Sequence, residues 1–262
     1  MFDRIAQVYD LLNTVMTAGL HHRWRERAAD LARVGPGARV LDVATGTGDL
    51  AIELARRVSP GGEVVGSDFS EGMLERARIK GVRALLDLPT EVSLGVRNGS
   101  PRIEPVSLSF EWGDALELPY ADDAFDAATV GFGARNFSDL QQGLREMARV
   151  VRPGGRVVVL EMTTPTRPPL SIFYRVWFDR IVPLIGRLAS IPARLRSRPG
   201  SSGQTTIAQA YTYLPNSVKR FHSPAALAGE LERAGCTGVG YVLMAGGIIA
   251  VHGATVREDA TP

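Results

Sequence analysis

The stretch Val40–Leu50, VLDVATGTGDL, decides the fold of this chain. Residues 40–43 read as a buried, mostly apolar strand, and Gly46 and Gly48 follow in a short loop. Residues 49–58 carry apolar side chains at helical spacing, so the first N–H groups of that helix face the loop. Glycine lets the backbone approach a ligand, because a Cβ there would collide with it. Strand, loop and helix together predict a nucleotide-type pocket.

Two kinds of nucleotide compete for this loop. Gly46-x-Gly48-x-x-Ala51 fits the relaxed dinucleotide fingerprint, which favours a nicotinamide cofactor. S-Adenosylmethionine is bound by the same strand–loop–helix arrangement. Asp42 favours this second cofactor, because a carboxylate at the strand end repels a pyrophosphate and suits the cationic amino group of a methionine. The connection from Val43 to Gly46 is also longer than the tight turn of dinucleotide folds.

Composition indicates one domain with an ordinary core. The chain has 262 residues, 45% of them hydrophobic, and a formal net charge of +2. A charge this small gives no case for a nucleic-acid partner. Cys236 is the only cysteine, which excludes a disulfide framework and fits a cytoplasmic location. We expect neither a signal peptide at the N-terminus nor a membrane span at 170–192, where charges and prolines interrupt the apolar run.

Strands and helices alternate along the chain after a first helix over 5–34. We expect strands at 39–43, 63–68, 107–112, 125–130 and 156–161, and helices at 49–58, 70–79, 139–150 and 225–234. Two last strands, 241–244 and 248–254, join as a hairpin across Gly246-Gly247. The pattern predicts an α/β fold with a doubly wound, Rossmann-like, seven-stranded sheet, mostly parallel with a C-terminal antiparallel hairpin. Segments 81–107 and 190–209 are expected to be irregular insertions.

Acidic residues follow the later strands where a nucleotide over the loop would lie. Asp68 ends the strand 63–68, and its carboxylate can accept from both ribose hydroxyls of an adenosine. The alternative for Asp68 is an N-cap or a turn. Asp114, followed by Ala115, comes after the next strand and could accept from the adenine amine, with a plain loop role as the alternative.

At this point the chain resembles a known family. The run from Asp42 through Asp68 and Asp114 to RVVRPGGRVVVLE is similar to class I S-adenosylmethionine-dependent methyltransferases. Five blocks narrow the resemblance to the ubiquinone/menaquinone biosynthesis C-methyltransferase family: Tyr9–Trp24, Gly131–Phe137 (GFGARNF), Arg149–Thr163, Ala210–Phe221 and Gly246–His252. The departures are Leu12 and Thr17 for the usual methionine and serine, Ala44 for the first glycine of the general loop, and Gly131 where some members carry a serine.

The resemblance implies one methyltransferase domain over 1–262. Its parts are an N-terminal helical cap (1–35), a cofactor-binding core (36–161), a lid (162–222), and a closing helix and hairpin (223–256). For S-adenosylmethionine it implies that Thr47 contacts the methionine portion, Asp68 the ribose, and Asp114 and Ala115 the adenine, while Asp42, Gly46 and Gly48 shape the pocket. Tyr9, Arg135 and Asn136 are implied to face a quinol substrate.

The implied reaction methylates a ring carbon of demethylmenaquinol. The 2-methoxy-6-polyprenyl-1,4-benzoquinol of ubiquinone biosynthesis is the second acceptor, and a nicotinamide-dependent quinone reductase or a non-catalytic cofactor-binding partner are alternatives of other classes. A quinol carbon becomes nucleophilic when a hydroxyl loses its proton, so we expect Arg135 to stabilise the phenolate with fixed charge. Asn136 and Tyr9 would orient the hydroxyl or pass its proton to water. No metal is needed, and His21 and His22 are read as packing or supporting residues.

Residues 168–192 combine aromatic side chains with arginines. We expect this segment to form a lid that contacts the membrane surface holding the polyprenyl tail, with its arginines near the headgroups. A packed lid without lipid contact is the alternative. The sequence leaves the oligomeric state and the tail length open.

Overall fold

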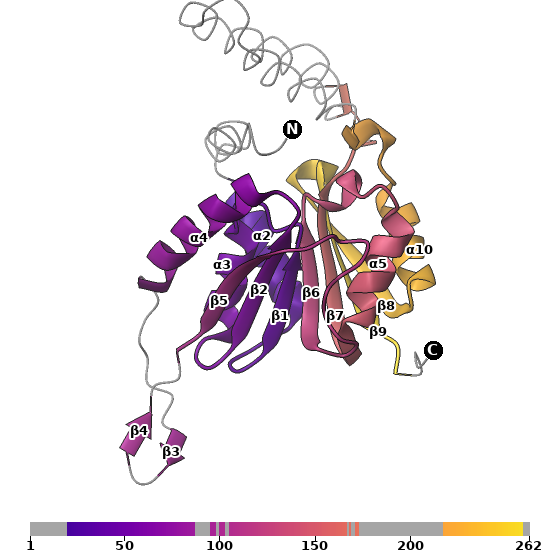
Figure 1. Cartoon of the computed structure of the whole chain (residues 1–262). Coiled ribbons are helices and arrows are strands. Elements are labelled where there is room, and N and C mark those ends of the chain that lie inside the picture. Colours follow the sequence, from indigo (N-terminus) through magenta and orange to yellow (C-terminus); the bar gives the residue numbers. More distant parts are fainter. Residues whose placement is uncertain are drawn as a thin grey trace, which may run out of the picture.

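The computed structural model of the chain describes residues 20–86, 95–97, 100–102, 105–166, 168, 171–172 and 217–258. In these ranges a seven-stranded sheet lies between two layers of helices (Figure 1). Its strands are β1 (Arg39–Val43), β2 (Glu63–Asp68), β5 (Ser107–Trp112), β6 (Phe125–Gly131), β7 (Val151–Met162), β8 (Cys236–Met244) and β9 (Ile249–Val256). The helices are α2 (His21–Ala32), α3 (Asp49–Val58), α4 (Glu71–Leu86), α5 (Leu140–Arg149) and α10 (Pro224–Arg233), with the 3-10 turns η1 (Ala134–Asn136) and η3 (Ala245–Gly247).

The sheet has the strand order β5-β2-β1-β6-β7-β9-β8. Strands β1, β2, β5, β6 and β7 pair in parallel, and β9 pairs antiparallel with both β7 and β8. The chain builds outward from β1 to β5, returns to the middle, and builds the other way from β6. The direction of winding therefore changes between β1 and β6, and the predicted doubly wound sheet with a closing antiparallel hairpin is confirmed.

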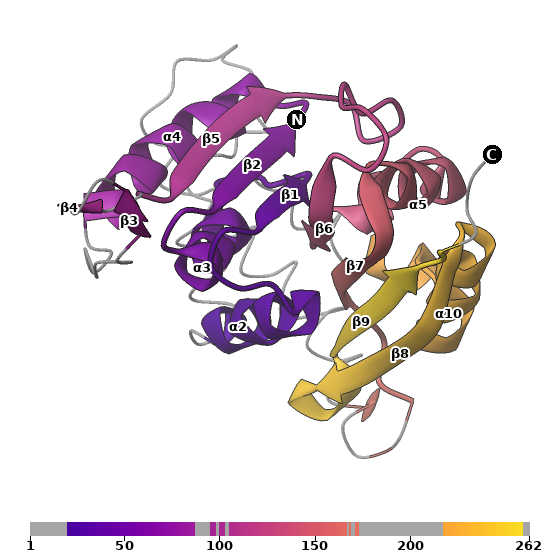
Figure 2. The same cartoon turned by 90° about the horizontal axis from the view of Figure 1, so that it is seen from below.

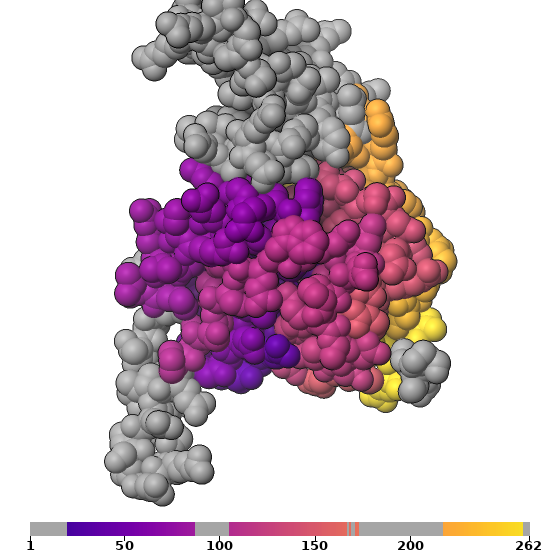
Figure 3. All heavy atoms as spheres, viewed as in Figure 1, coloured from indigo at the N-terminus to yellow at the C-terminus, as the bar shows by residue number. Residues whose placement is uncertain are grey.

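Helices cover both faces of this sheet. Helices α2, α3 and α4 pack on one face, and α5 and α10 pack on the other (Figures 1 and 2). The connection from β5 to β6 crosses in front of the sheet in the view of Figure 1. Its side chains cover the surface at the same place in the space-filling view (Figure 3). Each face buries a separate apolar cluster, one around Trp24 and Leu54 and the other around Leu144 and Leu231. The central strands read as apolar runs because both of their faces are buried.

The observed bounds follow local sequence signals. Strands β1, β2 and β5 and helix α3 span the predicted residues. Helix α5 begins after Asp139, whose side chain accepts from the N–H of Gln142, and α10 begins after Ser223, which caps its helix in the same way. Helix α2 ends at Ala32, slightly before its predicted end, where Arg33 takes a left-handed conformation.

Three segments differ from the prediction. Helix α4 continues to Leu86, because the helix formers after Gly81 outweigh that single glycine. The hairpin of β3 (Gly95–Arg97) and β4 (Ser100–Arg102) adds further regular structure to the segment expected to be irregular. Strand β8 begins at Cys236, well before the predicted start at 241. Strand β7 begins at Val151 instead of 156, and its pairing with β6 is broken between Val151 and Arg156.

Several predictions fall beyond the described ranges. Tyr9, the second insertion at 190–209 and most of the expected lid lie outside them. The division of the chain into cap, core, lid and closing hairpin therefore stays a prediction. In the part of the chain that the structure describes, no helix is long and apolar enough to cross a membrane.

The ring of Phe110 fixes the glycine loop against the sheet. A Cβ would lie 2.8 Å from this ring at Gly48, 2.6 Å at Gly66 and 2.8 Å at Gly81. The ring thus fills a socket made by the loop, β2 and α4. Gly48 also has a φ of +83°, so both its space and its conformation require glycine. The Cα of Gly48 therefore faces the ring of Phe110. The sequence had predicted instead that this glycine lets a ligand approach the backbone.

Replacing a glycine of this socket should destabilise the fold. Gly66→Ala places a methyl group against Phe110 and is expected to lower the free energy of unfolding by about 1–3 kcal/mol. Gly35→Ala is the matched control, because a Cβ there meets nothing within 4 Å. Urea denaturation measures both variants. Adding Phe110→Leu to Gly66→Ala should recover part of the loss, and a Gly66→Ala protein as stable as the wild type would contradict the socket.

Candidate cofactor site

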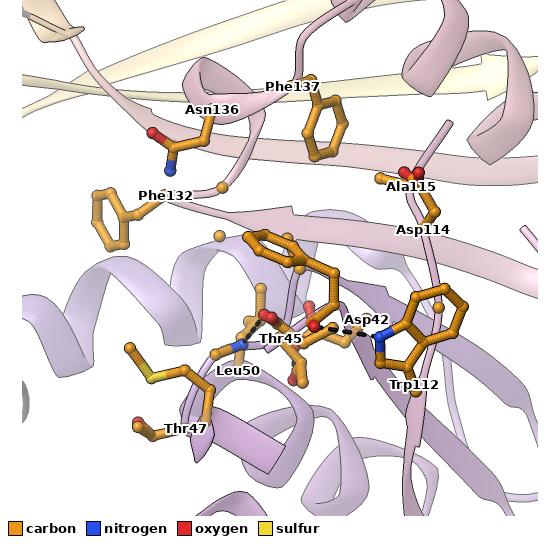
Figure 4. A pocket seen from close by; sticks show the side chains of 18 of the residues that line it. Asp42, Thr45, Thr47, Leu50, Trp112, Asp114, Ala115, Phe132, Asn136 and Phe137 are labelled. Atoms are coloured by element: carbon orange, nitrogen blue, oxygen red, sulfur yellow. Dashed lines mark hydrogen bonds between the residues drawn. The ribbon is translucent and has the colours of Figure 1, made fainter. Parts of the chain in front are cut away.

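A cavity of about 430 Å³ opens at the carboxyl ends of β1, β2 and β6, where the winding changes direction. This volume lies within the range of about 300–1,000 Å³ that small-molecule sites occupy. Its walls come from the loop after β1, the ends of β2 and β5, and the turn η1 after β6 (Figure 4). Most of the predicted site residues line it: Asp42, Gly46, Thr47, Asp68, Asp114, Ala115 and Asn136.

Asp42 is buried and joins the two central strands to the loop. Its carboxylate oxygens accept from the hydroxyls of Thr45 in the loop and Thr129 in β6, each at 2.6 Å. Burial raises the pKa of Asp42 to about 6, although the two hydroxyl hydrogen bonds act in the opposite direction. Asp42 therefore lines the cavity and holds the loop in place, which the sequence did not suggest, and its role toward a cofactor stays a prediction.

Asp68 connects the loop to the end of β2. Its Oδ2 accepts from the N–H of Gly46 at 2.8 Å, and its Oδ1 accepts from the N–H of Ser70 at 2.9 Å. The turn role that was the alternative reading is thus present. It does not compete with ribose binding, because a carboxylate has about four acceptor sites and Asp68 lines the cavity. Its contact with ribose stays a prediction.

The backbone of the loop fits a ligand at Gly46. This residue has a φ of +59°, and a Cβ there would meet no atom within 4 Å. Ala44, which stands where the general loop has a glycine, also has a positive φ of 51°. A Cβ at Gly133 would lie 2.6 Å from the methyl group of Ala44, so Gly133 makes room for that methyl group.

A polar cluster surrounds the start of α3. Thr47 is buried, and its hydroxyl accepts from Lys80 at 3.1 Å. Lys80 also pairs with Asp49, and Arg25 of α2 pairs with the same carboxylate at 3.0 Å. Burial acts to raise the pKa of Asp49, but Arg25 and Lys80 outweigh it and lower that pKa. Sequence reasoning missed both cations, because they lie on helices remote from the loop in the chain.

Two exposed aromatic side chains lie at the opposite end of the cavity. Trp112 and Phe69 are 61% and 58% exposed, and both line the cavity beside Asp114 and Ala115. The indole N–H of Trp112 donates to the carbonyl of Phe69 at 3.1 Å (Figure 4). Asp114 also makes the expected loop contact, accepting from the N–H of Leu116 at 2.9 Å. In the sequence, the clue to Phe69 was its position directly after Asp68.

Arg135 differs most from its prediction. Its side chain is 8% exposed and donates to Glu161 and to the carbonyl of Phe132, each at 2.6 Å. Glu161 is 1% exposed, so a buried carboxylate balances the charge that was expected to stabilise a phenolate. Arg135 is not among the described residues that line the cavity, whereas Asn136 and Phe137 of the same turn are (Figure 4). The GARN motif could not predict this pair, because Glu161 lies on β7.

His21 and His252 are placed as packing residues. His21 is buried against the ring of His22, and its pKa is lowered to about 4, first by burial and then by the charge of Arg25. His252 is buried in β9, with its Nε2 2.9 Å from the carbonyl of Pro224. Among the described residues no three His, Cys, Asp or Glu side chains form a group that could hold a metal ion.

The fold and this cavity define the chain as a methyltransferase of the S-adenosylmethionine-dependent class. Its glycine loop after β1 and the acid at the end of β2 are shared with dinucleotide-binding folds, and the closing antiparallel strand β9 is the feature that sets it apart from a dehydrogenase. The chain belongs to the ubiE/COQ5 methyltransferase family, whose model matches residues 1–256. The predicted family and enzyme class are confirmed.

Relatives of known name are similar over nearly the whole chain. A demethylmenaquinone methyltransferase of Thermus thermophilus is 42% identical over 252 residues, covering 96% of this chain and 98% of the relative. The enzyme of the same name from Deinococcus radiodurans is 44% identical, covering 90% and 83%. That from Mycobacterium tuberculosis is 36% identical, covering 100% and 93%.

Solved structures share the fold at low identity. A SAM-dependent methyltransferase from Aquifex aeolicus has a TM-score of 0.56 at 18% identity, covering 88% of this chain and 89% of its own. A SAM-dependent methyltransferase from Thermotoga maritima, described as a possible histamine N-methyltransferase, has a TM-score of 0.58 at 16% identity, covering 98% and 100%. These similarities confirm the fold class.

The raised pKa of Asp42 predicts a pH-dependent contribution to stability. The folded chain holds this proton more tightly than the unfolded chain, so the contribution is fully present below about pH 4 and is lost as pH rises through about 6. The free energy of unfolding of wild type minus that of Asp42→Asn should therefore fall by up to about 3 kcal/mol over this interval. Denaturant titrations between pH 4 and 8 measure it. Glu26→Gln, at an exposed position of α2, is the control, and a difference independent of pH would contradict the assignment.

Proposed function

We propose that this chain transfers a methyl group from S-adenosylmethionine to a ring carbon of demethylmenaquinol, giving menaquinol. The similarity to relatives named demethylmenaquinone methyltransferase carries this proposal, at 36–44% identity over 90–100% of the chain. The cavity supports it, because its glycine loop, its acids and its aromatic rim suit a nucleoside joined to an amino acid.

The cofactor would lie along the cavity from the aromatic rim to the polar cluster. Phe69 and Trp112 offer apolar faces for the adenine beside Asp114, and Asp68 offers acceptors for the ribose. Gly46 admits the backbone close to the ligand. Bound S-adenosylmethionine supplies a methyl group activated by its sulfonium, so the residues of the chain mainly have to fix the line of transfer and exclude water.

The quinol would approach from the side of the turn η1. Asn136 and Phe137 line the cavity there, and Asn136 can orient a quinol hydroxyl through its amide (Figure 4). We propose that Arg135 positions Asn136 through its ion pair with Glu161 and the carbonyl of Phe132. Tyr9, outside the described residues, keeps its proposed role in handling the hydroxyl proton. Bound in the cavity, S-adenosylmethionine would supply the methyl group and leave as S-adenosylhomocysteine, and the methylated ring carbon would give its proton to water.

A transfer assay with two acceptors tests this function. The enzyme, supplied with methyl-labelled S-adenosylmethionine, should methylate a short-tailed demethylnaphthoquinol. It should methylate the corresponding methoxy-benzoquinol more slowly, because the relatives that are similar over the full chain carry the menaquinone name. Scintillation counting of the extracted quinone measures both. Faster transfer to the benzoquinol would replace the acceptor by that of ubiquinone biosynthesis, and no transfer to either would contradict the proposal.

Removing both charges of the buried pair separates the two roles of Arg135. Arg135→Gln alone leaves Glu161 buried without its cation and should cost about 3–5 kcal/mol of stability. Arg135→Gln with Glu161→Gln should recover most of that loss and, if Arg135 only positions the turn, much of the turnover. Thermal unfolding and the transfer assay measure both effects. A stable double variant without turnover would return Arg135 to a direct role on the phenolate.

A contact between residues 168–192 and the membrane surface belongs to the same proposal. Its support is the sequence, in which aromatic residues alternate with arginines, and nearly all of the segment lies outside the described residues. The polyprenyl tail of the substrate gives such a contact its purpose. Co-sedimentation with anionic vesicles tests it: binding that is absent, or unaffected by charge reversal at Arg175 and Arg187, would remove this part.

A further inference from the structure

Arg25 is a buried cation in the wall of the cavity. It is 8% exposed and lines the cavity from helix α2, whose other buried residues pack on the sheet. Its Nη2 lies 3.0 Å from Oδ2 of Asp49. Its Nη1 is also buried, and no hydrogen-bond partner for it exists among the described residues. A buried donor without an acceptor costs free energy, so an acceptor on a ligand beside Arg25 would stabilise this side chain.

The surroundings of Arg25 favour an anion as that acceptor. Asp49 is the first residue of α3, and the N-terminus of that helix carries a partial positive charge. Lys80 adds a second cation beside Asp49 and Thr47. The lowered pKa of the neighbouring His21 shows the same positive field, since after burial the charge of Arg25 is its main cause.

The carboxylates near this corner have partners of their own. Asp42 accepts from Thr45 and Thr129, and Asp49 is shared between Arg25 and Lys80. Arg25 therefore lines the cavity with a guanidinium that the described carboxylates satisfy only in part, and a ligand that brings its own carboxylate would suit it. The amino-acid portion of S-adenosylmethionine carries both an ammonium and a carboxylate, and the cavity holds Asp42 and Arg25 as the corresponding opposite charges.

We infer that Arg25 binds the carboxylate of the cofactor's methionine portion and distinguishes S-adenosylmethionine from adenosine ligands that lack this group. The inference rests on the proposed use of S-adenosylmethionine. It assigns the methionine end of the site to a side chain of the helix that precedes the sheet. Asp49 is then a positioning residue, because it holds the guanidinium of Arg25 through Nη2.

Calorimetry with two ligands tests the inference. S-Adenosylmethionine and decarboxylated S-adenosylmethionine differ only in the carboxylate. The wild type should bind the first at least about tenfold more tightly, as expected for a charged hydrogen bond. Arg25→Gln should weaken S-adenosylmethionine about tenfold or more and change the decarboxylated ligand less than about twofold. Arg25→Lys, which keeps the charge, should fall between them.

The ratio of the two dissociation constants does not depend on the fraction of folded protein, because both constants are measured on one preparation. Arg27→Gln, at an exposed position of the same helix, is the matched control and should keep the wild-type ratio. If Arg25→Gln does not fold, the wild-type ratio and Arg25→Lys decide. Equal wild-type affinity for both ligands, or equal weakening of both in the variants, would overturn the inference. A wild type that binds neither ligand would instead contradict the proposed function.

Discussion

The site depends on the buried carboxylate of Asp42, which joins the glycine loop to the neighbouring strand β6. One oxygen is bonded to Thr129 on β6 and the other to Thr45 in the loop after β1, across the place where the sheet changes its direction of winding. The loops that leave β1 and β6 must diverge there, which opens the cavity between them. The two hydroxyls make it possible to bury the charge, whose pKa is raised by that burial. Together with the packing of Ala44 beside Gly133, this connection fixes the glycine loop to the second half of the sheet.

The two ends of the cavity differ in the chemistry of the side chains around them. Behind the loop, the ring of Phe110 fills the space that glycines at three positions leave open. At one end Phe69 and Trp112 expose large aromatic surfaces that line the cavity. At the other end Arg25, Asp49 and Lys80 form a charged cluster around the start of α3. An adenosine joined to an amino acid has the same polarity, apolar and planar at one end and charged at the other.

Sequence reasoning succeeded where a signal is local. The strand–loop–helix at 40–58, the acid at the end of β2 and the alternation that gives a doubly wound sheet are all written in neighbouring residues, and the structure has them at the predicted places. It failed where a side chain is defined by a partner far along the chain. Glu161 turns Arg135 toward β7, and the cation at Arg25 reaches Asp49 from a helix that precedes the sheet. Such pairs have no spacing that a motif could record, so neither the pairing of Arg135 with Glu161 nor that of Arg25 with Asp49 could be predicted.

The central claim is that this cavity takes S-adenosylmethionine and not a dinucleotide. Titration calorimetry of the full chain with S-adenosylmethionine and with NADH tests it most directly, because the glycine loop alone fits both. The account predicts one site for S-adenosylmethionine with a dissociation constant in the micromolar range, about 8 kcal/mol of binding free energy, and no measurable heat with NADH. Saturable binding of NADH, with none of S-adenosylmethionine, would contradict it.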